Sequence, residues 1–526
     1  MTRGNPLSVT SSTPSRQKGG EAVFARIYGA ATLGLNGHVI AVETDISNGL
    51  PSFDLVGLAA TSVKEAKERV RAAVKNSGYE FPMRRLTVNL APADLKKDTA
   101  GLDLSLAVAI LVSSGQIPEE ACENCLFLGE LALDGRIRPV NGILPMVLEG
   151  AAQGMKAVFV SRDNAAEALL CPDLTVYGVE TLCDVAGHLT GDKPLAAARA
   201  APPAPDLADY DVDFSEVQGQ AEAKRVLEIA AAGGHNVLMI GPPGSGKTML
   251  AKRIPTILPP MSETEALEVT KIYSVAGLLR DGQLMHRRPF RSPHHTISTA
   301  GLVGGGSIPK PGEVTLSHHG VLFLDELPEF PRSVLEVLRQ PLEDGVVHIA
   351  RVQAALSYPS RFVLVAAMNP CPCGRYGFDE GCICSESEIR RYTHKISGPL
   401  LDRIDLHVRV ERPAYQELIT RRKAESSAAI RSRVLSARHR QQERLAPYGC
   451  TCNAHMGHRE IRATCQLTEA AQQLLREAFD VLRLSARSYD RIIKVSQTIA
   501  DLAKEPVIAK EHVAEAISYR NKMQQP

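Results

Sequence analysis

The residues with the clearest chemistry form a glycine-rich loop directly after an apolar run at 236–240. The loop consists of Gly241, Pro242, Pro243, Gly244, Ser245, Gly246, Lys247 and Thr248, and a helical pattern follows it. This order is the context of a phosphate-binding loop, because glycines let backbone N–H groups turn towards phosphates. Lys247 can reach the β- and γ-phosphates, and the Thr248 hydroxyl can ligate Mg²⁺. The sequence therefore predicts binding of ATP with Mg²⁺.

An acidic pair follows a second apolar run at 320–324. Asp325 and Glu326 stand at the carboxyl end of this predicted buried strand. Carboxylates at that point are the expected partners of a phosphate-binding loop. Asp325 would hold Mg²⁺ through water, and Glu326 would orient and polarise the attacking water. The pair therefore predicts hydrolysis as well as binding.

Four cysteines crowd into 14 residues after a third apolar run at 361–369. They are Cys371, Cys373, Cys382 and Cys384. Four thiolates can hold tetrahedral zinc, which would fold a loop that lacks a core of its own. Two Cys-x-Cys arms are tighter than the usual Cys-x-x-Cys knuckle, so structural zinc and free thiols both stay open. Adjacent histidines at 294–295 and 318–319 are a weaker metal signal, since neighbours rarely converge on one ion.

The composition is that of a soluble protein with several domains. The chain has 526 residues, a formal net charge of +1 and no tryptophan. No apolar stretch approaches the roughly 20 residues of a membrane span. Residues 1–20 lack the apolar centre of a secretory signal. We expect a cytoplasmic protein with no membrane partner and reduced thiols, in which any nucleic-acid surface is a local patch.

The pattern predicts an α/β chain with an α+β domain, a P-loop domain and a helical lid. We expect a disordered tail at residues 1–21, the first domain at 22–190 and a linker at 191–210. Residues 211–410 would form the ATPase core with insertions and the cysteine-rich loop, and 411–526 a basic helical segment and the C-terminal lid. In the first domain we expect strands at 23–28, 39–44, 53–56, 85–90, 126–133, 157–160 and 174–179, and helices at 62–77 and 102–112.

The first domain resembles the noncatalytic relatives of the Lon protease domain. The resemblance lies in residues 89–98, 129–135 and 141–142. Active Lon-type domains use a Ser–Lys pair, whereas the matching positions here hold Gly101 and Met146. A thioether cannot take a proton from a serine. The resemblance therefore implies an inactive domain, in which Ser105, Ser113 and Ser114 are helix and turn residues.

The second domain resembles the ring ATPases of the AAA+ class. The third apolar strand ends in Asn369, at the position that senses the γ-phosphate in that class. Residues 397–405 resemble the arginine-finger segment, so Arg403 would reach a neighbouring subunit's nucleotide; an ion pair with Asp402 or Asp405 is the structural alternative. Arg487 matches the second sensor arginine, which contacts the γ-phosphate from the lid.

Over about 22–518 the motifs together resemble the Mg-chelatase-like AAA+ family of bacterial competence proteins. The resemblance implies a homohexamer that hydrolyses ATP to move single-stranded or branched DNA. It implies a role in branch migration during homologous recombination and natural transformation, with other recombination proteins as further partners. A chelatase-type motor acting on a protein partner is the alternative, and a Lon-type protease is the least favoured.

Three segments are candidates for contact with DNA. The loop at 301–312 carries Lys310 and could point into a ring pore. A predicted hairpin at 345–358 carries His348 and Arg351, and basic residues on such hairpins can follow a phosphate backbone; a solvated hairpin is the alternative. The basic segment between 411 and 447 could bind phosphates, pack on a neighbouring subunit or form a solvated face.

Overall fold

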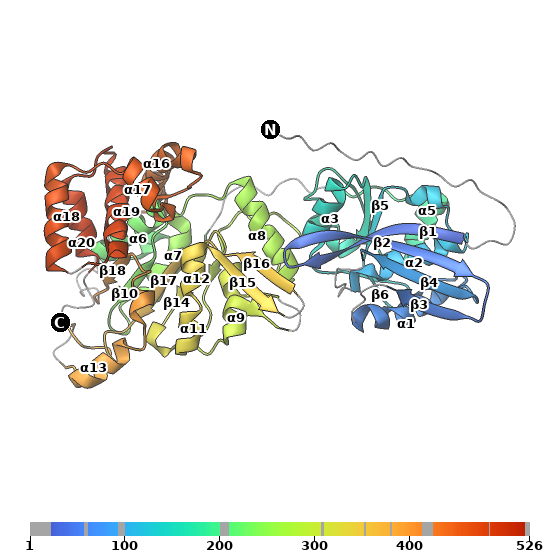
Figure 1. Cartoon of the computed structure of the whole chain (residues 1–526), viewed down its shortest axis with the longest axis horizontal. Helices are drawn as coiled ribbons and strands as arrows, with labels where there is room; N and C mark the ends of the chain where they lie inside the picture. The colour runs from blue at the N-terminus through green and yellow to red at the C-terminus, as the bar shows by residue number, and fades with distance from the viewer. Residues whose placement is uncertain are drawn as a thin grey trace. The chain divides into compact units, whose positions relative to one another are not determined.

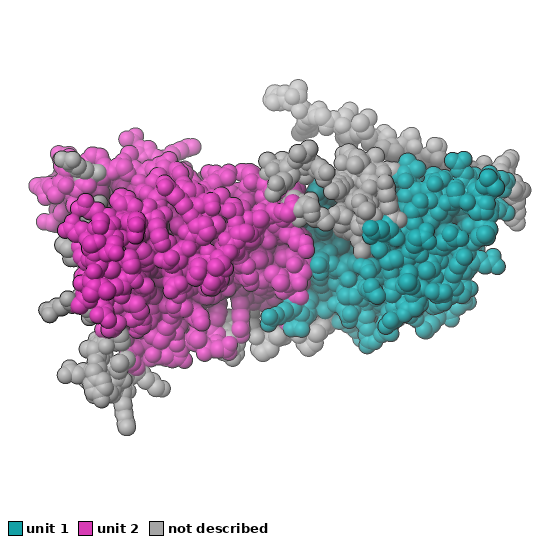
Figure 2. All heavy atoms as spheres, turned by 90° about the horizontal axis from the view of Figure 1, so that it is seen from below, with its two compact units in different colours: residues 1–201, 280–282 teal, residues 202–279, 283–526 magenta. Residues whose placement is uncertain are grey.

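The computed structural model describes residues 23–56, 61–92, 100–199, 210–306, 310–351, 354–378, 381–412, 424–482 and 484–520. The chain divides into two compact units, residues 1–201 with 280–282 (unit 1) and residues 202–279 with 283–526 (unit 2), as Figure 2 shows. The predicted tail, residues 200–209 of the predicted linker and the basic residues 421–423 lie outside the described ranges. Within those ranges, no helix is both long and apolar enough to span a bilayer.

Unit 1 is built on a seven-stranded mixed sheet in the order β3-β4-β2-β1-β5-β8-β9. The strands are β1 (Val23–Leu33), β2 (Asn36–Ser47), β3 (Ser52–Val56), β4 (Arg85–Ala91), β5 (Cys125–Leu128), β8 (Ala157–Ser161) and β9 (Thr175–Val179). β1 pairs antiparallel with β2 along its whole length, while β5, β8 and β9 continue the sheet in parallel. A small ribbon of β6 (Glu130–Leu131) and β7 (Ile137–Arg138) follows β5.

Helix α2 (Asp103–Ser113) lies in the core of unit 1, and all eleven of its residues are buried. Its near-continuous apolar sequence predicts this position. The carboxylate of this helix, Asp103, is buried and accepts hydrogen bonds from Arg69 (3.0 Å) and from the Leu131 N–H (3.2 Å). Burial nevertheless raises the pKa of Asp103 to about 6. The other helices of the unit are α1 (Thr61–Asn76), α3 (Ile143–Ala152), α4 (Ala165–Ala168) and α5 (Leu182–Thr190).

Unit 2 contains a five-stranded parallel sheet in the order β11-β14-β17-β10-β18. Its strands are β10 (Val237–Ile240), β11 (Phe290–Arg291), β14 (Val321–Leu324), β17 (Val363–Met368) and β18 (Leu406–Arg409). Every residue of β10 and β14 is buried, as continuous apolar runs in parallel sheets usually are. Ile240 pairs with Met368, and Leu324 with Ala366, so the carboxyl ends of β10, β14 and β17 meet at one edge.

The C-terminal region is helical, as predicted, and shares a continuous apolar core with the sheet. Helices α16 (Ser427–Leu445) and α19 (Ala486–Ala503) pack against α6 (Ala221–Gly233), and Figure 1 shows these C-terminal helices in orange and red. The His407 N–H of β18 also donates to the Tyr519 carbonyl (2.7 Å), just after α20 (Lys510–Ser518). The remaining helices of the unit are α7 (Lys247–Ile257), α8 (Glu263–Ala276), α9 (Thr299–Val303), α10 (Glu313–Leu316), α11 (Arg332–Glu336), α12 (Arg339–Asp344), α13 (Glu386–Thr393), α14 (Gly398–Leu401), α17 (His458–Thr464) and α18 (Glu469–Val481).

Two hairpins project from the segments around β14. The predicted hairpin at 345–358 is confirmed as β15 (Val346–Arg351) and β16 (Ala354–Pro359). The predicted loop at 301–312 instead begins as the end of α9 and continues as a ribbon of β12 (Gly304–Gly305) and β13 (Lys310–Pro311). A Cβ atom on Gly304 would lie 3.1 Å from Ile349, so the two hairpins pack against each other.

Candidate nucleotide site

The glycine-rich loop turns sharply between β10 and α7. Gly244 (φ +78°) and Gly246 (φ +89°) adopt the left-handed conformation that only glycine takes readily. Gly241 is needed for another reason, since a Cβ atom there would lie 2.2 Å from the Val410 carbonyl oxygen. The loop therefore has the backbone shape that its glycines predict, and it leads into the first turn of α7.

The Lys247 side chain bridges the loop and the neighbouring strand. Its ammonium donates to the Gly241 carbonyl (2.7 Å), the Pro242 carbonyl (2.9 Å) and the Asn369 side-chain oxygen (3.3 Å). Burial lowers the pKa of Lys247, while the nearby carboxylates oppose that shift. The ammonium thus remains paired at the carboxyl edge of the sheet, beside the amide that ends β17.

A hydroxyl and a carboxylate converge next to this lysine. Thr248 Oγ1 donates a 2.7 Å hydrogen bond to Asp325 Oδ2, and Asp325 directly follows β14. Both groups offer oxygen atoms, which are the ligands that Mg²⁺ prefers. The donor set therefore fits Mg²⁺, and Thr248 and Asp325 are the residues that would hold it.

Glu326 has an unusual backbone for a residue with a side chain. Its φ of +52° is left-handed, and its N–H donates to Asp325 Oδ1 (3.0 Å). Such backbone conformations cost of order 1–3 kcal/mol and cluster at functional sites. The exposed Glu326 carboxylate lies 3.6 Å from His295 Nδ1. No motif in residues 287–295 indicates from sequence that His295 is a partner of Glu326.

The predicted finger arginine, Arg403, and the predicted sensor arginine, Arg487, lie elsewhere and share one acid. The buried Arg403 guanidinium pairs with Glu343 and donates to the Pro399 carbonyl (2.8 Å). Arg487, at the start of α19, lies 3.3 Å from the other oxygen of Glu343. Asp402 and Asp405, the alternative ion-pair partners predicted for Arg403, are paired with other arginines. Asp402 pairs with Arg520, and Asp405 pairs with Arg491. Sequence reasoning missed Glu343, which sits in no recognisable motif.

This arginine cluster sits at the opposite end of the sheet from the glycine-rich loop. Asn236, immediately before β10, donates to the Arg403 carbonyl (3.0 Å). A cavity of about 510 Å³ at this end is lined by Gly234 and Asn236, by 360–362 just before β17, and by Arg403, Arg487 and Lys494. The four residues of β10 span about 13 Å between the two ends. The structure therefore brings together Lys247, Thr248, Asp325, Glu326 and Asn369, but not Arg403 or Arg487.

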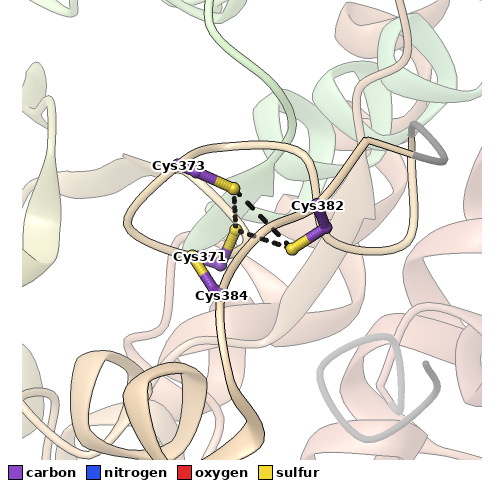
Figure 3. A group of neighbouring side chains, drawn as sticks. All are labelled: Cys371, Cys373, Cys382 and Cys384. Carbon is purple, nitrogen blue, oxygen red and sulfur yellow. Dashed lines mark hydrogen bonds between the residues drawn. The ribbon is translucent and has the colours of Figure 1, made fainter.

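The four predicted cysteine ligands do converge (Figure 3). The sulfur of Cys371 lies 3.3 Å from that of Cys373 and 3.8 Å from that of Cys382. The sulfurs of Cys373 and Cys382 are 3.7 Å apart, and all four sulfurs, including that of Cys384, lie within 4.8 Å of one another. Hydrogen bonds from the backbone of Ile383 and Arg375 lower the pKa of Cys373 to about 6.

The histidine pair at 318–319 meets Glu268 rather than forming a clear metal site. His318 and His319 Nε2 lie 3.1 Å and 2.9 Å from Glu268 Oε2. His318 Nδ1 accepts the Arg361 N–H (3.0 Å), so in the neutral ring Nε2 carries the proton and donates to the carboxylate. That nitrogen has no lone pair left for a metal. The cluster is therefore a hydrogen-bonded one.

The predicted basic segment is largely committed to contacts within the chain. On α16, Arg433 pairs with Glu228, and Arg438 donates to the Ala231 and Ala232 carbonyls. Arg444 pairs with Asp501 (2.7 Å) on α19. These guanidinium groups hold α16 against α6 and α19, so they do not form an open phosphate-binding surface.

The three serines near the matched Lon-type positions bond to nearby backbone carbonyls. Ser105, Ser113 and Ser114 donate to carbonyls three residues earlier at 2.8, 3.1 and 3.1 Å. Gly101 lies in a 3-10 turn (Ala100–Leu102), and Met146 is buried in α3. These contacts are those of the helix and turn residues that the sequence predicts, and neither matched position supplies a proton acceptor.

Comparison with known proteins covers almost the whole chain. The family described as "Magnesium chelatase, subunit ChlI" matches residues 213–418, "Subunit ChlI of Mg-chelatase" matches 42–164, and "Magnesium chelatase, subunit ChlI C-terminal" matches 424–520. Competence protein ComM of Haemophilus influenzae is 43% identical over 501 residues, 94% of this chain and 97% of that protein. Uncharacterized protein YifB of Salmonella typhimurium is 44% identical over 502 residues, with the same coverage. Lon protease of Mycolicibacterium smegmatis is 27% identical over 168 residues, 30% of this chain and 21% of the protease.

Proposed function

The chain belongs to the Mg-chelatase-like family that includes ComM and YifB, and we propose that it is an ATP-hydrolysing ring motor that moves along DNA. In this proposal it assembles as a homohexamer and promotes branch migration during homologous recombination and natural transformation. The similarity to a competence protein supports the process, and the geometry of unit 2 supports the chemistry.

The carboxyl edge of the sheet would bind and hydrolyse MgATP. Residues 241–248 would wrap the phosphates, with Lys247 leaving the carbonyls of its own loop for the β- and γ-phosphates. Bound Mg²⁺ would neutralise phosphate charge between Thr248 and Asp325. Glu326 would orient the attacking water and receive its proton, and Asn369, already in contact with Lys247, would sense the γ-phosphate.

One observation supports a ring of subunits. The two arginines that should complete this nucleotide site lie at the other end of the sheet. Arg403 and Arg487 are held together by Glu343 at the amino-terminal edge, whereas the loop follows the carboxyl end of β10. A head-to-tail arrangement of identical chains would bring this edge against the nucleotide of the next chain. We propose that both arginines act there, where an arginine finger is worth roughly 10³–10⁵ in rate.

DNA would meet the paired hairpins rather than α16. Lys310 is exposed at the start of β13, and β15–β16 carries His348 and Arg351. His348 Nδ1 is hydrogen-bonded to Ser357 (2.8 Å), which fixes its ring on the hairpin. An exposed lysine and a fixed imidazole on hairpins suit a contact that follows the phosphate backbone and does not read sequence.

A motor acting on a protein partner is the second candidate. It is favoured by the three family descriptions, all of which name a subunit of a larger enzyme. The two candidates differ in their response to nucleic acid. A Lon-type protease is the least favoured, because the serine hydroxyls of α2 are bonded to helix carbonyls.

The decisive experiment measures ATP hydrolysis and strand displacement on forked and four-way DNA. We expect DNA to stimulate hydrolysis and junctions to be resolved into duplex products only with ATP. The Glu326→Gln chain is the control, which should bind DNA and ATP without turnover. Hydrolysis that is indifferent to single-stranded and branched DNA would refute the DNA motor, and recovery of a protein partner without DNA retention would favour the second candidate.

A further inference from the structure

The four-cysteine cluster and the nucleotide site are in direct contact. We propose that Cys371, Cys373, Cys382 and Cys384 bind one Zn²⁺ ion, and that the metal-bound loop supports the glycine-rich loop and Asn369 of the nucleotide site. The metal would thus set the affinity for MgATP as well as local stability. The coupling rests on the proposed ATPase function, whereas the metal site itself does not.

The spacing of the sulfurs fits a tetrahedral ion. Sulfurs held about 2.3 Å from one Zn²⁺ at tetrahedral angles lie about 3.8 Å from one another. The separations among the sulfurs of Cys371, Cys373 and Cys382 are 3.3, 3.7 and 3.8 Å, and the sulfur of Cys384 completes the set within 4.8 Å. A disulfide needs a separation of about 2.0 Å, so these thiols are grouped without being paired.

The loop that carries these cysteines has little else to hold it. In the described residues of 371–384 there is no helix or strand, and Ile383, which stands between two of the ligands, is 87% exposed. From outside the loop, Arg409 donates to the Gly377 carbonyl and lies over the Phe378 ring. Backbone N–H groups turn inward instead, and that of Tyr376 donates to the Cys371 sulfur (3.4 Å). Inward N–H groups and an outward apolar residue suit a loop folded around an ion, because such bonds support metal-bound thiolates.

The loop that carries the four cysteines is in van der Waals contact with the glycine-rich loop. Gly374, with φ +80°, lies so close that a Cβ atom there would be 2.5 Å from Pro243 Cδ. On its other side, the Pro243 carbonyl accepts a hydrogen bond from Arg412 (3.4 Å). Pro243 is therefore held between the cysteine loop and the segment after β18.

The cysteine loop also continues directly from Asn369. Only Pro370 separates that amide from the buried Cys371. The backbone of Asn369 is further hydrogen-bonded to the Tyr392 hydroxyl of α13, the helix that follows the cysteine loop. Fixing the cysteines thus fixes both neighbours of Asn369, and through it the amide oxygen that contacts Lys247.

Two pairs of variants separate the metal from its effect on nucleotide. Cys382→Ser/Cys384→Ser removes two ligands, and Cys183→Ser removes an exposed thiol of unit 1 as its control. Gly374→Ala keeps all four ligands but forces the loop away from Pro243. Gly381→Ala is its matched control, because the added methyl would meet only the mobile end of Arg375.

The measurements are zinc content by elemental mass spectrometry, MgATP affinity by titration with a fluorescent analogue, and thermal unfolding, all on the full chain. We expect about one zinc per chain in the wild type and both controls, and none in the double cysteine variant. We expect Gly374→Ala to keep its zinc but to bind MgATP about tenfold to a hundredfold more weakly, as misplacement of a binding loop by about 1 Å can cause.

Three results would overturn parts of this inference. A wild-type chain that holds no zinc, and whose reduced form shows no tetrahedral thiolate spectrum on titration with Co²⁺, would refute the metal site. The coupling would be refuted if the wild type held one zinc per chain while Gly374→Ala and the zinc-free double cysteine variant both bound MgATP with wild-type affinity. A zinc-loaded wild type that binds no MgATP would refute the proposed ATPase and leave the metal site standing.

Discussion

Mixing two different defective chains tests whether Arg403 and Arg487 serve the same neighbouring nucleotide. Three variants suffice: Lys247→Ala, which loses the glycine-rich loop's cation, and Arg403→Ala and Arg487→Ala, which lose the cluster at the other end of β10. Each variant alone should hydrolyse ATP at a small fraction of the wild-type rate, since a finger contributes roughly 10³–10⁵. The informative quantity is the rate recovered by each pairwise mixture.

The expected recovery follows from the placement of the residues. In a closed head-to-tail ring assembled from equal amounts of two chains, a given ordered pair of neighbours occurs at about one quarter of interfaces. If Arg487 acts on the neighbour, Lys247→Ala mixed with Arg487→Ala should recover about one quarter of the wild-type rate. Arg403→Ala mixed with Arg487→Ala should recover nothing, because every chain then lacks one of the two arginines.

The opposite pattern would refute this assignment. If Arg487 completed the nucleotide site of its own chain, the first mixture would stay inactive and the second would recover about one quarter of the rate. The rates of both mixtures are measured as steady-state ATP hydrolysis at constant total protein, with the chains mixed before assembly. Arg476→Ala, on the exposed face of α18, is the control and should behave like the wild type.

Three further predictions concern the nucleotide site, acid stability and the lid. Glu326→Gln should bind MgATP with unchanged affinity and lose at least about 100-fold in turnover, which filter binding and phosphate release measure; normal turnover would exclude Glu326 as the water-polarising group. Burial lowers the pKa of His319 and His407 to about 4, so the unfolded chain binds more protons between about pH 6.5 and 4. Stability should therefore fall with decreasing pH by at most about 1.4 kcal/mol per pH unit for each histidine, and a urea midpoint that is constant across this window would contradict it. Arg444→Ala leaves the buried Asp501 carboxylate without its cation and should lower the free energy of unfolding by about 3 kcal/mol, against less than about 0.5 kcal/mol for an exposed arginine.

The parts of the site that could be predicted from the sequence are those whose functional residues directly follow a strand. The glycine-rich loop, Asp325 and Asn369 each stand just after an apolar run, and parallel strands bring such ends to one edge. The bounds of α1 and α2 were predictable to within a residue or so, because a one-sided or fully apolar helix leaves a clear pattern.

The parts that could not be predicted depend on contacts between distant segments. Glu343 and Arg487 are 144 residues apart (487 − 343), and neither periodicity nor spacing links them. The basic composition of α16 indicated an exposed surface, yet its arginines bond to carbonyls and carboxylates of α6 and α19. Composition reports charge without reporting its partners, whereas the packing shows that Arg433 and Arg444 are paired with carboxylates and that Arg438 is bonded to carbonyls.

The continuous core between the parallel sheet and the C-terminal helices limits how this protein can move. Residues of β10, α6, α16 and α19 belong to one apolar cluster, and β18 is hydrogen-bonded to the segment after α20. A hinge between the sheet and the C-terminal helices would have to open that core. In the proposed ring, mechanical work would therefore come from one whole unit 2 rotating against the next rather than from a lid closing over its own nucleotide, and force would be carried across the interfaces between subunits.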